Sequence, residues 1–446
     1  MRKRIFISMH YMELGGAEIS LIGLLHALDY SKYEVDLFIH SHQGEMMQFI
    51  PKEVNLLPEI KEYAMIERPM TEVLREGCLK VLFARLKAKW QFRRYLQKKG
   101  IAESAAVFQY VGNAVTPVLP SLASLGEYDL AISFLHPHNI VRDKVLAKKK
   151  VSWIHTDYTR IDINVEQELP VWSAFDHIVS ISPDVTKTFL QVFPSLKDKI
   201  VEMENILSAE FVRERAEEFN VNPNANPNAN GNGNVNLLET CGTSEQARAN
   251  ANPNANPNAN GNDNERVINI LSVGRFCEAK NYDNVPDICR LVNANANPNL
   301  NLNNEAKLTV RWFLIGWGGD EQLIRQKIKE AGMEDNVIIL GKRSNPYPYM
   351  KACDIYAQPS RYEGKSVTVR EAQMLCKPVV ITDYATAKSQ IQDGVDGVIV
   401  PMDNEGCAKG IADFIRNTAL QSKIVEYLQT HDYGNENEAK KIDNLI

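Results

Sequence analysis

Two glutamates in the last quarter of the chain, Glu363 and Glu371, flank a Gly-Lys-Ser turn with seven residues between them. Ser366 is a favourable helix N-cap, and 367–376 contains neither glycine nor proline, so we expect a helix there. The apolar segment 353–360 before the turn predicts a buried strand. A helix that starts directly after a strand presents unpaired backbone N–H groups and a positive helix end, which together favour an anion.

The two carboxylates themselves suit sugars. A carboxylate cannot bind a phosphate, but it can accept two hydrogen bonds from a sugar diol. One glutamate for each sugar, with a phosphate between them at the helix start, predicts a nucleotide-sugar site. The alternative interpretation is a surface helix whose two acids, Glu363 and Glu371, are simply solvated.

Two cations follow another predicted strand in the same half of the chain. The run that begins at Val267 ends in Gly274-Arg275, and Lys280 follows five residues later. Because the carboxyl ends of parallel strands meet at one edge of a sheet, we expect these cations near the glutamates. A guanidinium forks onto phosphate oxygens while an ammonium acts as a point charge, so the pair suits a diphosphate. Either residue alone could be an ordinary surface cation.

Strand-like segments alternate with helical or polar ones through both halves of the chain. They lie at 4–9, 34–40, 128–135, 151–155 and 177–182, and then at 267–275, 308–316, 336–341, 353–360, 378–383 and 397–401. This alternation predicts an α/β protein with two doubly wound parallel sheets, each with helices on both faces. Gly15 and Gly16 follow the first strand and would let the backbone approach a ligand closely, although they could equally start a helix.

Low-complexity tracts interrupt the chain where the first domain should end. Residues 222–236 and 249–264 consist almost entirely of Asn, Ala, Pro and Gly, and 293–304 is similar. Such tracts have little apolar surface to bury, so we expect them to be disordered. The predicted organisation is an N-terminal domain 1–207, a linker 208–264 and a C-terminal domain 265–446.

Composition narrows the classes of function. A net charge of -6 over 446 residues argues against a dedicated nucleic-acid binder. Seven cysteines form no Cys-x-x-Cys pair, and the first residues lead into a strand without a signal-peptide core. We therefore expect a cytoplasmic protein with reduced thiols.

One segment, 77–100, departs from this acidic background. It contains eight Lys and Arg residues and no acid, interleaved with Leu, Phe, Trp and Tyr. It predicts either an ordinary solvated helix that packs through its apolar stripe or an interfacial helix on anionic lipid at the inner membrane face.

The motifs together resemble a known family. The glutamate pair, the Gly274-Arg275 and Lys280-Asn281 stretch, and a Gly-Gly-Ala-Glu stretch after the first strand are similar to the motifs of retaining GT-B glycosyltransferases of family 4. These are the glycosyl transferases group 1, of the bacterial capsular and cell-surface polysaccharide type. The resemblance implies two Rossmann-like domains facing across a cleft, with the nucleotide sugar held mainly by the second. It covers nearly the whole chain apart from 41–125, the Asn-rich tracts and the C-terminal tail.

The resemblance also implies residue roles. The implied catalytic residues are His155, beside the donor sugar near the reacting carbon, and Glu363, Arg275 and Lys280. The implied substrate-binding residues are Gly15, Gly16, Arg343, Gly364, Lys365, Ser366, Val367 and Glu371. Many relatives carry an aromatic residue where this chain has Lys365, which leaves the donor hexose open.

The implied activity is transfer of a hexose from a UDP- or GDP-sugar to a hydroxyl of a glycan or lipid-linked acceptor, with retention of configuration, in cell-surface polysaccharide synthesis. The chain has no Asp-x-Asp motif, which agrees with a reaction without metal or cofactor. Two alternatives remain open. One is a nucleotide-sugar epimerase of the same fold, with water as acceptor, and the other is a non-catalytic nucleotide-sugar-binding scaffold.

Overall fold

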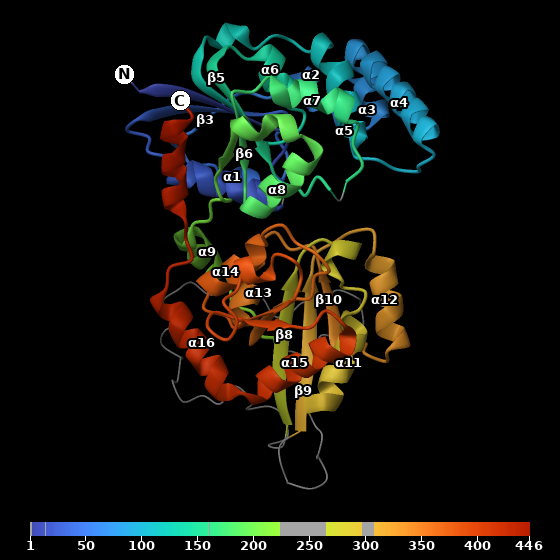
Figure 1. Cartoon of the computed structure of the whole chain (residues 1–446), viewed down its shortest axis with the longest axis vertical. Helices are drawn as coiled ribbons and strands as arrows, with labels where there is room; N and C mark the ends of the chain where they lie inside the picture. Colours follow the sequence, from blue (N-terminus) through green and yellow to red (C-terminus); the bar gives the residue numbers. More distant parts are fainter. Residues whose placement is uncertain (1, 14, 160, 224–264, 297–306) are drawn as a thin grey trace. The chain divides into compact units, whose positions relative to one another are not determined.

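The structure, a computed structural model, describes residues 2–13, 15–159, 161–223, 265–296 and 307–446. The chain divides into two compact units, Met1–Ser208 with Asn435–Ile446 and Ala209–Gly434. Each unit is built around one parallel sheet (Figure 1). No helix within the described residues has the combined length and apolar character needed to cross a bilayer.

The first unit has a seven-stranded sheet in the order β3-β2-β1-β4-β5-β6-β7. Its strands are β1 (Lys3–Met9), β2 (Tyr33–Ile39), β3 (Asn55–Leu56), β4 (Tyr128–Ser133), β5 (Ala147–Ile154), β6 (His177–Ser180) and β7 (Ile200–Glu202). Its helices are α1 (Gly16–Ala27), α2 (Lys61–Ala64), α3 (Met70–Arg75), α4 (Leu79–Lys99), α5 (Ala106–Val115), α6 (Asn139–Lys144), α7 (Val165–Ser173) and α8 (Pro183–Val192). The 3₁₀ segment η7 (Glu436–Asn444) completes it.

The second unit has a six-stranded sheet in the order β10-β9-β8-β11-β12-β13. Its strands are β8 (Glu265–Val273), β9 (Lys307–Ile315), β10 (Val337–Gly341), β11 (Ile355–Gln358), β12 (Val379–Thr382) and β13 (Val398–Val400). Its helices are α9 (Ala209–Ala216), α11 (Val285–Ala296), α12 (Glu321–Glu330), α13 (Tyr347–Ala352), α14 (Val367–Met374), α15 (Asn404–Arg416) and α16 (Thr418–Thr430). The short 3₁₀ segment η5 (Glu278–Lys280) lies between β8 and α11.

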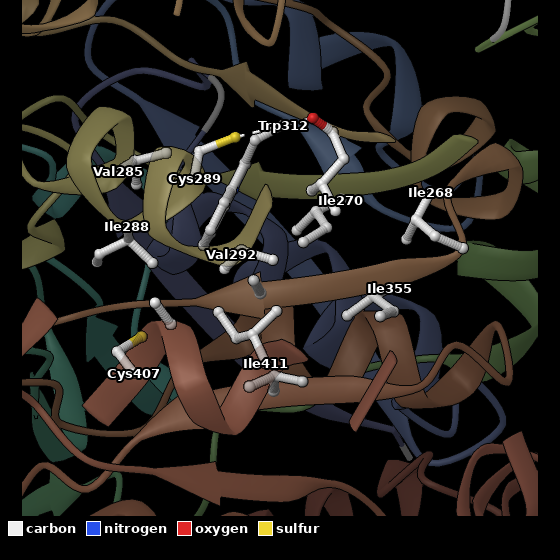
Figure 2. Packing of buried hydrophobic residues seen from close by; sticks show 14 of the residues in the cluster. Ile268, Ile270, Val285, Ile288, Cys289, Val292, Trp312, Ile355, Cys407 and Ile411 are labelled. Carbon is white, nitrogen blue, oxygen red and sulfur yellow. Dashed lines mark hydrogen bonds between the residues drawn. The ribbon is translucent and has the colours of Figure 1, made fainter. Parts of the chain in front are cut away.

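The apolar run of β8 is explained by burial on both faces of the second sheet. Side chains alternate along a strand, so Ile268 and Ile270 join one core cluster while Leu271 and Val273 join the other. Figure 2 shows the first cluster, in which Ile270 packs among side chains of helix α11 and of the neighbouring strand β9. The sheet is thus held between two apolar layers, and its strand ends are left to carry polar residues.

The predicted fold class is confirmed by these two parallel sheets, and each predicted strand is present with shifted ends. Two strands were missed, β3 and β7, which are only two and three residues long at the sheet edges. Such short strands carry too few residues for a period-two pattern to be seen. The predicted helix 367–376 ends earlier, at Met374, and Cys376 then adopts a positive φ of 54°.

Two predicted boundaries differ from the structure. The tail 435–446, assigned to the C-terminal domain, belongs to the first unit, where Ile442 and Leu445 are buried. Helix α9, inside the predicted linker 208–264, belongs to the second unit, where it packs on α13 and α14. Its buried Val212 and Ala216 supply the apolar face that a linker would lack.

The predicted disorder of 293–304 is wrong for its first residues, because Asn293–Ala296 form the last turn of α11. The Asn293 amide donates to the Val310 carbonyl at 3.2 Å, and its carbonyl accepts from the Val310 N–H at 2.8 Å. A polar side chain can therefore join a helix end to strand β9. Of the remaining tract residues, 224–236, 249–264 and 297–304 lie outside the described residues.

Candidate active site

The candidate site of the second unit lies where two neighbouring strands end. The chain leaves β8 in one direction towards β9 and β10, whereas β11 lies on the other side of β8, so the sheet order reverses between these two strands. In parallel α/β sheets such a reversal opens a crevice beyond the carboxyl ends of the strands, where ligands bind. The loop after β8 carries Arg275 and Lys280, and the turn after β11 carries Glu363.

These two loops meet through an ion pair. Lys280 Nζ lies 2.6 Å from Glu363 Oε1, and both side chains are largely buried, at 20% and 12% exposure. The same oxygen accepts hydrogen bonds from Gln358 Nε2 at 2.8 Å and Ser360 Oγ at 2.6 Å. Three donors therefore fix Glu363 through one oxygen, and among the described residues no hydrogen bond reaches the other oxygen.

A second ion pair fixes the backbone of the two loops. The Arg361 guanidinium binds both carboxylate oxygens of Asp283, at 2.9 and 2.7 Å, and also donates to the Glu278 carbonyl at 2.6 Å. The Arg361 N–H donates to the Ala279 carbonyl at 2.8 Å. A planar guanidinium with two fixed partners sets orientation as well as distance. The relative position of Lys280 and Glu363 is thus fixed by neighbours that the sequence motif does not include.

The helix start differs from its prediction in one respect. Ser366 occupies the N-cap position of α14, but its side chain makes no capping bond and instead contacts Thr368 Oγ1 at 3.1 Å. The Ser366 N–H donates to Gln390 Oε1 at 3.0 Å, and Thr386 Oγ1 donates to the Glu363 carbonyl at 2.9 Å. The loop after β12 therefore holds the turn that sequence reasoning assigned to a serine cap.

Glu371 lies on the inner side of α14, with 1% of the residue exposed. Its Oε1 accepts a hydrogen bond from the Tyr347 hydroxyl at 2.8 Å, and its buried Oε2 has no partner among the described residues. Burial raises the pKa of Glu371 to about 7, although the bond from Tyr347 opposes the shift. The interpretation of Glu371 as a solvated surface acid is therefore wrong.

The remaining predicted residues of this unit do not join the ion pair. Arg275 is exposed and forms no salt bridge with the part of the chain that the structure describes. Arg343, after β10, donates from Nε to the Tyr349 hydroxyl at 3.1 Å. Gly364, Lys365 and Val367 lie half-buried in the turn and at the first position of α14.

In the first unit, His155 follows β5 and is held as a neutral ring. Its Nε2 lies 3.0 Å from the Phe134 carbonyl, which can only accept, so Nε2 carries the proton and Nδ1 does not. Burial lowers the pKa of His155 to about 4, and its ring packs on Phe134 and Trp153. A neutral imidazole can orient a neighbouring group by hydrogen bonding, but it carries no charge near pH 7.

The two glycines after β1 begin helix α1, with Gly15 at the N-cap and Gly16 at the first helical position. A side chain on Gly15 would place its Cβ 2.3 Å from Glu18 Oε2. A larger residue here would therefore make the Glu18 carboxylate shift, which is a reason for glycine within the fold itself.

The sequence interpretation gave no role to His10, directly after β1. Its imidazole lies between two carboxylates, with Nε2 3.9 Å from Glu18 Oε1 and Nδ1 3.5 Å from Glu67 Oε1. Burial opposes protonation, but hydrogen bonds and charge interactions with both acids outweigh it and raise the pKa of His10 to about 9. The only indication in the sequence that His10 could have a role was its position directly after the first strand. The paired acids, 49 positions apart, were not recognisable in sequence.

Comparisons with known proteins find similarity to glycosyltransferases. Residues 255–431 match the family model of the glycosyl transferases group 1. The chain is 34% identical over 137 residues to N-acetylgalactosamine-N,N'-diacetylbacillosaminyl-diphospho-undecaprenol 4-alpha-N-acetylgalactosaminyltransferase of Campylobacter jejuni, covering 30% of this chain and 34% of that protein. It is 23% identical over 179 residues to amylovoran biosynthesis glycosyltransferase AmsD of Erwinia amylovora, covering 40% of this chain and 47% of that protein. The matched regions thus span about a third and about half of these relatives.

Among solved structures, the fold is similar to that of Anabaena HepE in complex with UDP-glucose. The TM-score is 0.58 at 14% identity, over 99% of this chain and 100% of the other. At this identity the likeness concerns the fold alone. Residues 255–431 are thus similar to the glycosyl transferases group 1, and the chain has the GT-B fold, with two Rossmann-like domains built on parallel sheets.

Proposed function

We propose that this chain is a retaining, metal-independent glycosyltransferase that moves a hexose from a UDP- or GDP-sugar to a hydroxyl of a glycan or lipid-linked acceptor. The observation that carries the proposal is the Lys280–Glu363 pair at the sheet reversal, with buried Glu371 eight positions further along, in helix α14. A cation beside a fixed carboxylate offers one partner for a phosphate and one for a sugar hydroxyl.

The donor contacts follow from these positions. On binding, the diphosphate takes over the Lys280 ammonium, and exposed Arg275 adds a second cation as charge develops on the leaving phosphate. Glu363, released from that ion pair but still held by Gln358 and Ser360, accepts hydrogen bonds from the donor hexose. Glu371 accepts hydrogen bonds from the ribose.

Neutral His155 is assigned to positioning, because an imidazole whose pKa is about 4 cannot stabilise a negative charge near pH 7. The acceptor proton would pass to the donor phosphate on the same face of the sugar. No group of metal-ligating side chains is found within the described residues, and in the proposed site Lys280 and Arg275 supply the positive charge for the diphosphate.

The acceptor class rests on the relatives. The Campylobacter jejuni relative is named for a diphospho-undecaprenol acceptor, and the Erwinia amylovora relative for amylovoran biosynthesis. We propose an acceptor of the same kind, a growing glycan or its lipid-linked precursor, and a place of work at the cytoplasmic face of the membrane.

The test is nucleotide release from a panel of UDP- and GDP-sugars, with and without added acceptor, and product anomers assigned by NMR. Lys280→Ala should lower kcat/KM for the active donor about 10- to 150-fold, since a charge-assisted hydrogen bond contributes about 1.5–3 kcal/mol. Arg275→Ala should lower it in the same direction.

The control is Lys351→Ala, which removes an equally short ion pair, 2.6 Å to Glu217, from an exposed position of the same unit. Because Lys280→Ala also leaves Glu363 without its cation, melting temperatures are compared for all three variants. Unchanged turnover in Lys280→Ala and Arg275→Ala would contradict the site. An inverted product, or sugar epimerisation with water as acceptor, would contradict the reaction.

A further inference from the structure

Helix α4 (Leu79–Lys99) has one face committed to its own unit. Its buried residues are Val81, Ala84 and Ala88, and Ala88 packs against the neighbouring helix α5. Tyr95 on the same side donates to Asp162 Oδ1 at 3.0 Å. This inner face attaches the helix to the first unit without help from its outer residues.

The outer face of α4 is apolar. Leu79, Phe83, Leu86 and Trp90 are 50%, 65%, 47% and 57% exposed. Their spacings of four, three and four residues place them within one narrow stripe, since successive residues turn by about 100°. They are four of the ten large apolar side chains found exposed within the described residues, so this is a concentration and not a scatter.

Cations flank this stripe on both sides. At about 100° per residue, one flank carries Lys80, Lys87, Arg94 and Lys98, and the other carries Lys89 and Arg93. All six are exposed, and none forms a salt bridge with a residue that the structure describes. Helix α4 contains no acidic residue.

The other two cations of the helix are used internally. Arg85 donates to the carbonyl of Met65 at 2.8 Å and to the carbonyl of Arg68, and Lys99 pairs with Asp162 at 2.7 Å. The Arg94 guanidinium lies over the Trp90 ring at 4.7 Å, so one of the flanking cations contacts the apolar stripe. The eight cations of the segment thus separate into six that face outward and two that hold the helix in place.

We propose that α4 is a docking surface for an anionic lipid membrane. The stripe of Leu79, Phe83, Leu86 and Trp90 enters the interface between headgroups and acyl chains, and the six flanking cations pair with anionic headgroups. An apolar centre between two cationic margins matches the layering of such a surface. A second copy of the same helix fits poorly, because six cations would face six cations.

The proposal deepens the proposed function and rests on it for the acceptor, since a docked enzyme can reach a lipid-linked substrate. Attachment itself does not depend on the reaction. Its failure and the failure of the transferase assignment are therefore measured separately, by vesicle binding and by donor hydrolysis.

The test is co-sedimentation of the full chain with vesicles of phosphatidylcholine alone and with about a third phosphatidylglycerol. The wild type should bind the anionic vesicles at low salt, and binding should weaken as salt screens the cations. The triple variant Lys87→Gln, Lys89→Gln, Arg93→Gln should weaken binding roughly a hundredfold, at about fivefold for each cation near the surface. Phe83→Ser with Leu86→Ser should weaken it comparably while leaving the charge unchanged.

The matched control removes three cations from α12, the exposed Arg325 and Lys329 and the half-buried Lys327, as Arg325→Gln, Lys327→Gln, Lys329→Gln, and should bind as the wild type does. Trp90 supplies a second measurement, because Trp153, Trp172 and Trp312 are buried and Trp317 is half-buried. Its emission should shift to the blue on anionic vesicles, and Trp90→Phe should bind without that shift.

Equal binding to neutral vesicles, binding to neither, or equal loss in the α12 control would each overturn the proposal. Self-association that the Phe83→Ser, Leu86→Ser variant abolishes would assign the stripe to a second copy instead. All variants should keep the melting temperature and donor hydrolysis of the wild type, since none of these residues touches the candidate active site.

Discussion

Replacing Glu371 by glutamine should separate the stability of the second unit from its function. The carboxyl is buried, holds one hydrogen bond from Tyr347 at 2.8 Å, and leaves its other oxygen without a partner. Burial without full compensation favours the protonated form, and raises the pKa from 4.5 to about 7. Glutamine has the same shape, can still accept from Tyr347, and does not titrate.

The sign of the effect follows from the protons bound. The folded pKa lies above the unfolded one, so the folded state binds more protons between pH 4.5 and 7. The stabilisation linked to Glu371 is complete below pH 4.5 and is lost as pH rises through 7. A shift of about 2.5 pKa units corresponds to about 3 kcal/mol as an upper value. Relative to the wild type, Glu371→Gln should therefore gain up to about 3 kcal/mol between pH 5 and pH 8.

The assay is the difference in melting temperature between variant and wild type at pH 5, 6, 7 and 8. The introduced glutamine has an amide group without a hydrogen-bond partner, as Oε2 of Glu371 is. The resulting loss of stability is the same at every pH, so it cancels when the differences at two pH values are compared. Tyr347→Phe is the control, because it removes the hydrogen bond but keeps the titrating carboxyl. A difference that does not change with pH would refute the assignment of a raised pKa to Glu371.

Glu371→Gln should weaken nucleotide binding, although it stabilises the fold relative to the wild type at high pH. Calorimetry with free UDP or GDP should show weaker binding by Glu371→Gln, because we place that carboxylate on the ribose. Glu363→Gln should bind free nucleotide almost as the wild type does and should lose sugar transfer. The reverse pattern would mean that the two roles are exchanged.

Two further changes test other parts of the chain. The pKa of His10 is about 9 in the folded state, against 6.5 for an unperturbed histidine, so its ion pairs stabilise the first unit fully below pH 6.5 and lose effect as pH rises through 9. His10→Gln should therefore lower the melting temperature at pH 6 more than at pH 10. An equal loss at both pH values would contradict this. Replacing 224–264 by a short Gly-Ser linker should keep turnover within a few-fold, because doubling a loop's length costs only about 0.6 kcal/mol. Loss of activity in a protein with unchanged melting temperature would show that the tract has a further role.

The sheets could be predicted because their signal is local. In β8 the apolar residues that fill both cores, Ile268, Ile270, Leu271 and Val273, lie within six positions, and the following Gly274 and Arg275 mark the strand end. The Glu363 turn could be found for the same reason, since strand, turn and helix lie within about twenty residues. Such a local pattern predicts at which edge of a sheet, or on which face of a helix or strand, a residue lies.

Partners distant in sequence could not be predicted. The Arg361–Asp283 pair joins loops 78 positions apart, and Tyr347 reaches Glu371 from a different helix. The tail returns to the first unit because Leu207 N–H finds Asn435 Oδ1 at 2.8 Å and Ile442 is buried there. The apolar residues of α4 were visible in sequence, but only packing divides them into an inner and an outer face.

In the proposed donor site, the Lys280–Glu363 pair explains how two opposite charges can lie side by side. Removing either partner would leave a largely buried charge without compensation, which is strongly unfavourable, so the pair maintains both groups before donor binds. Gln358 and Ser360 hold Glu363 independently of Lys280, and the Arg361–Asp283 pair holds both loops. A diphosphate can therefore replace the carboxylate as the partner of Lys280 without displacing Glu363. On the proposed function, arrival of the phosphate is the event that frees Glu363 for the sugar.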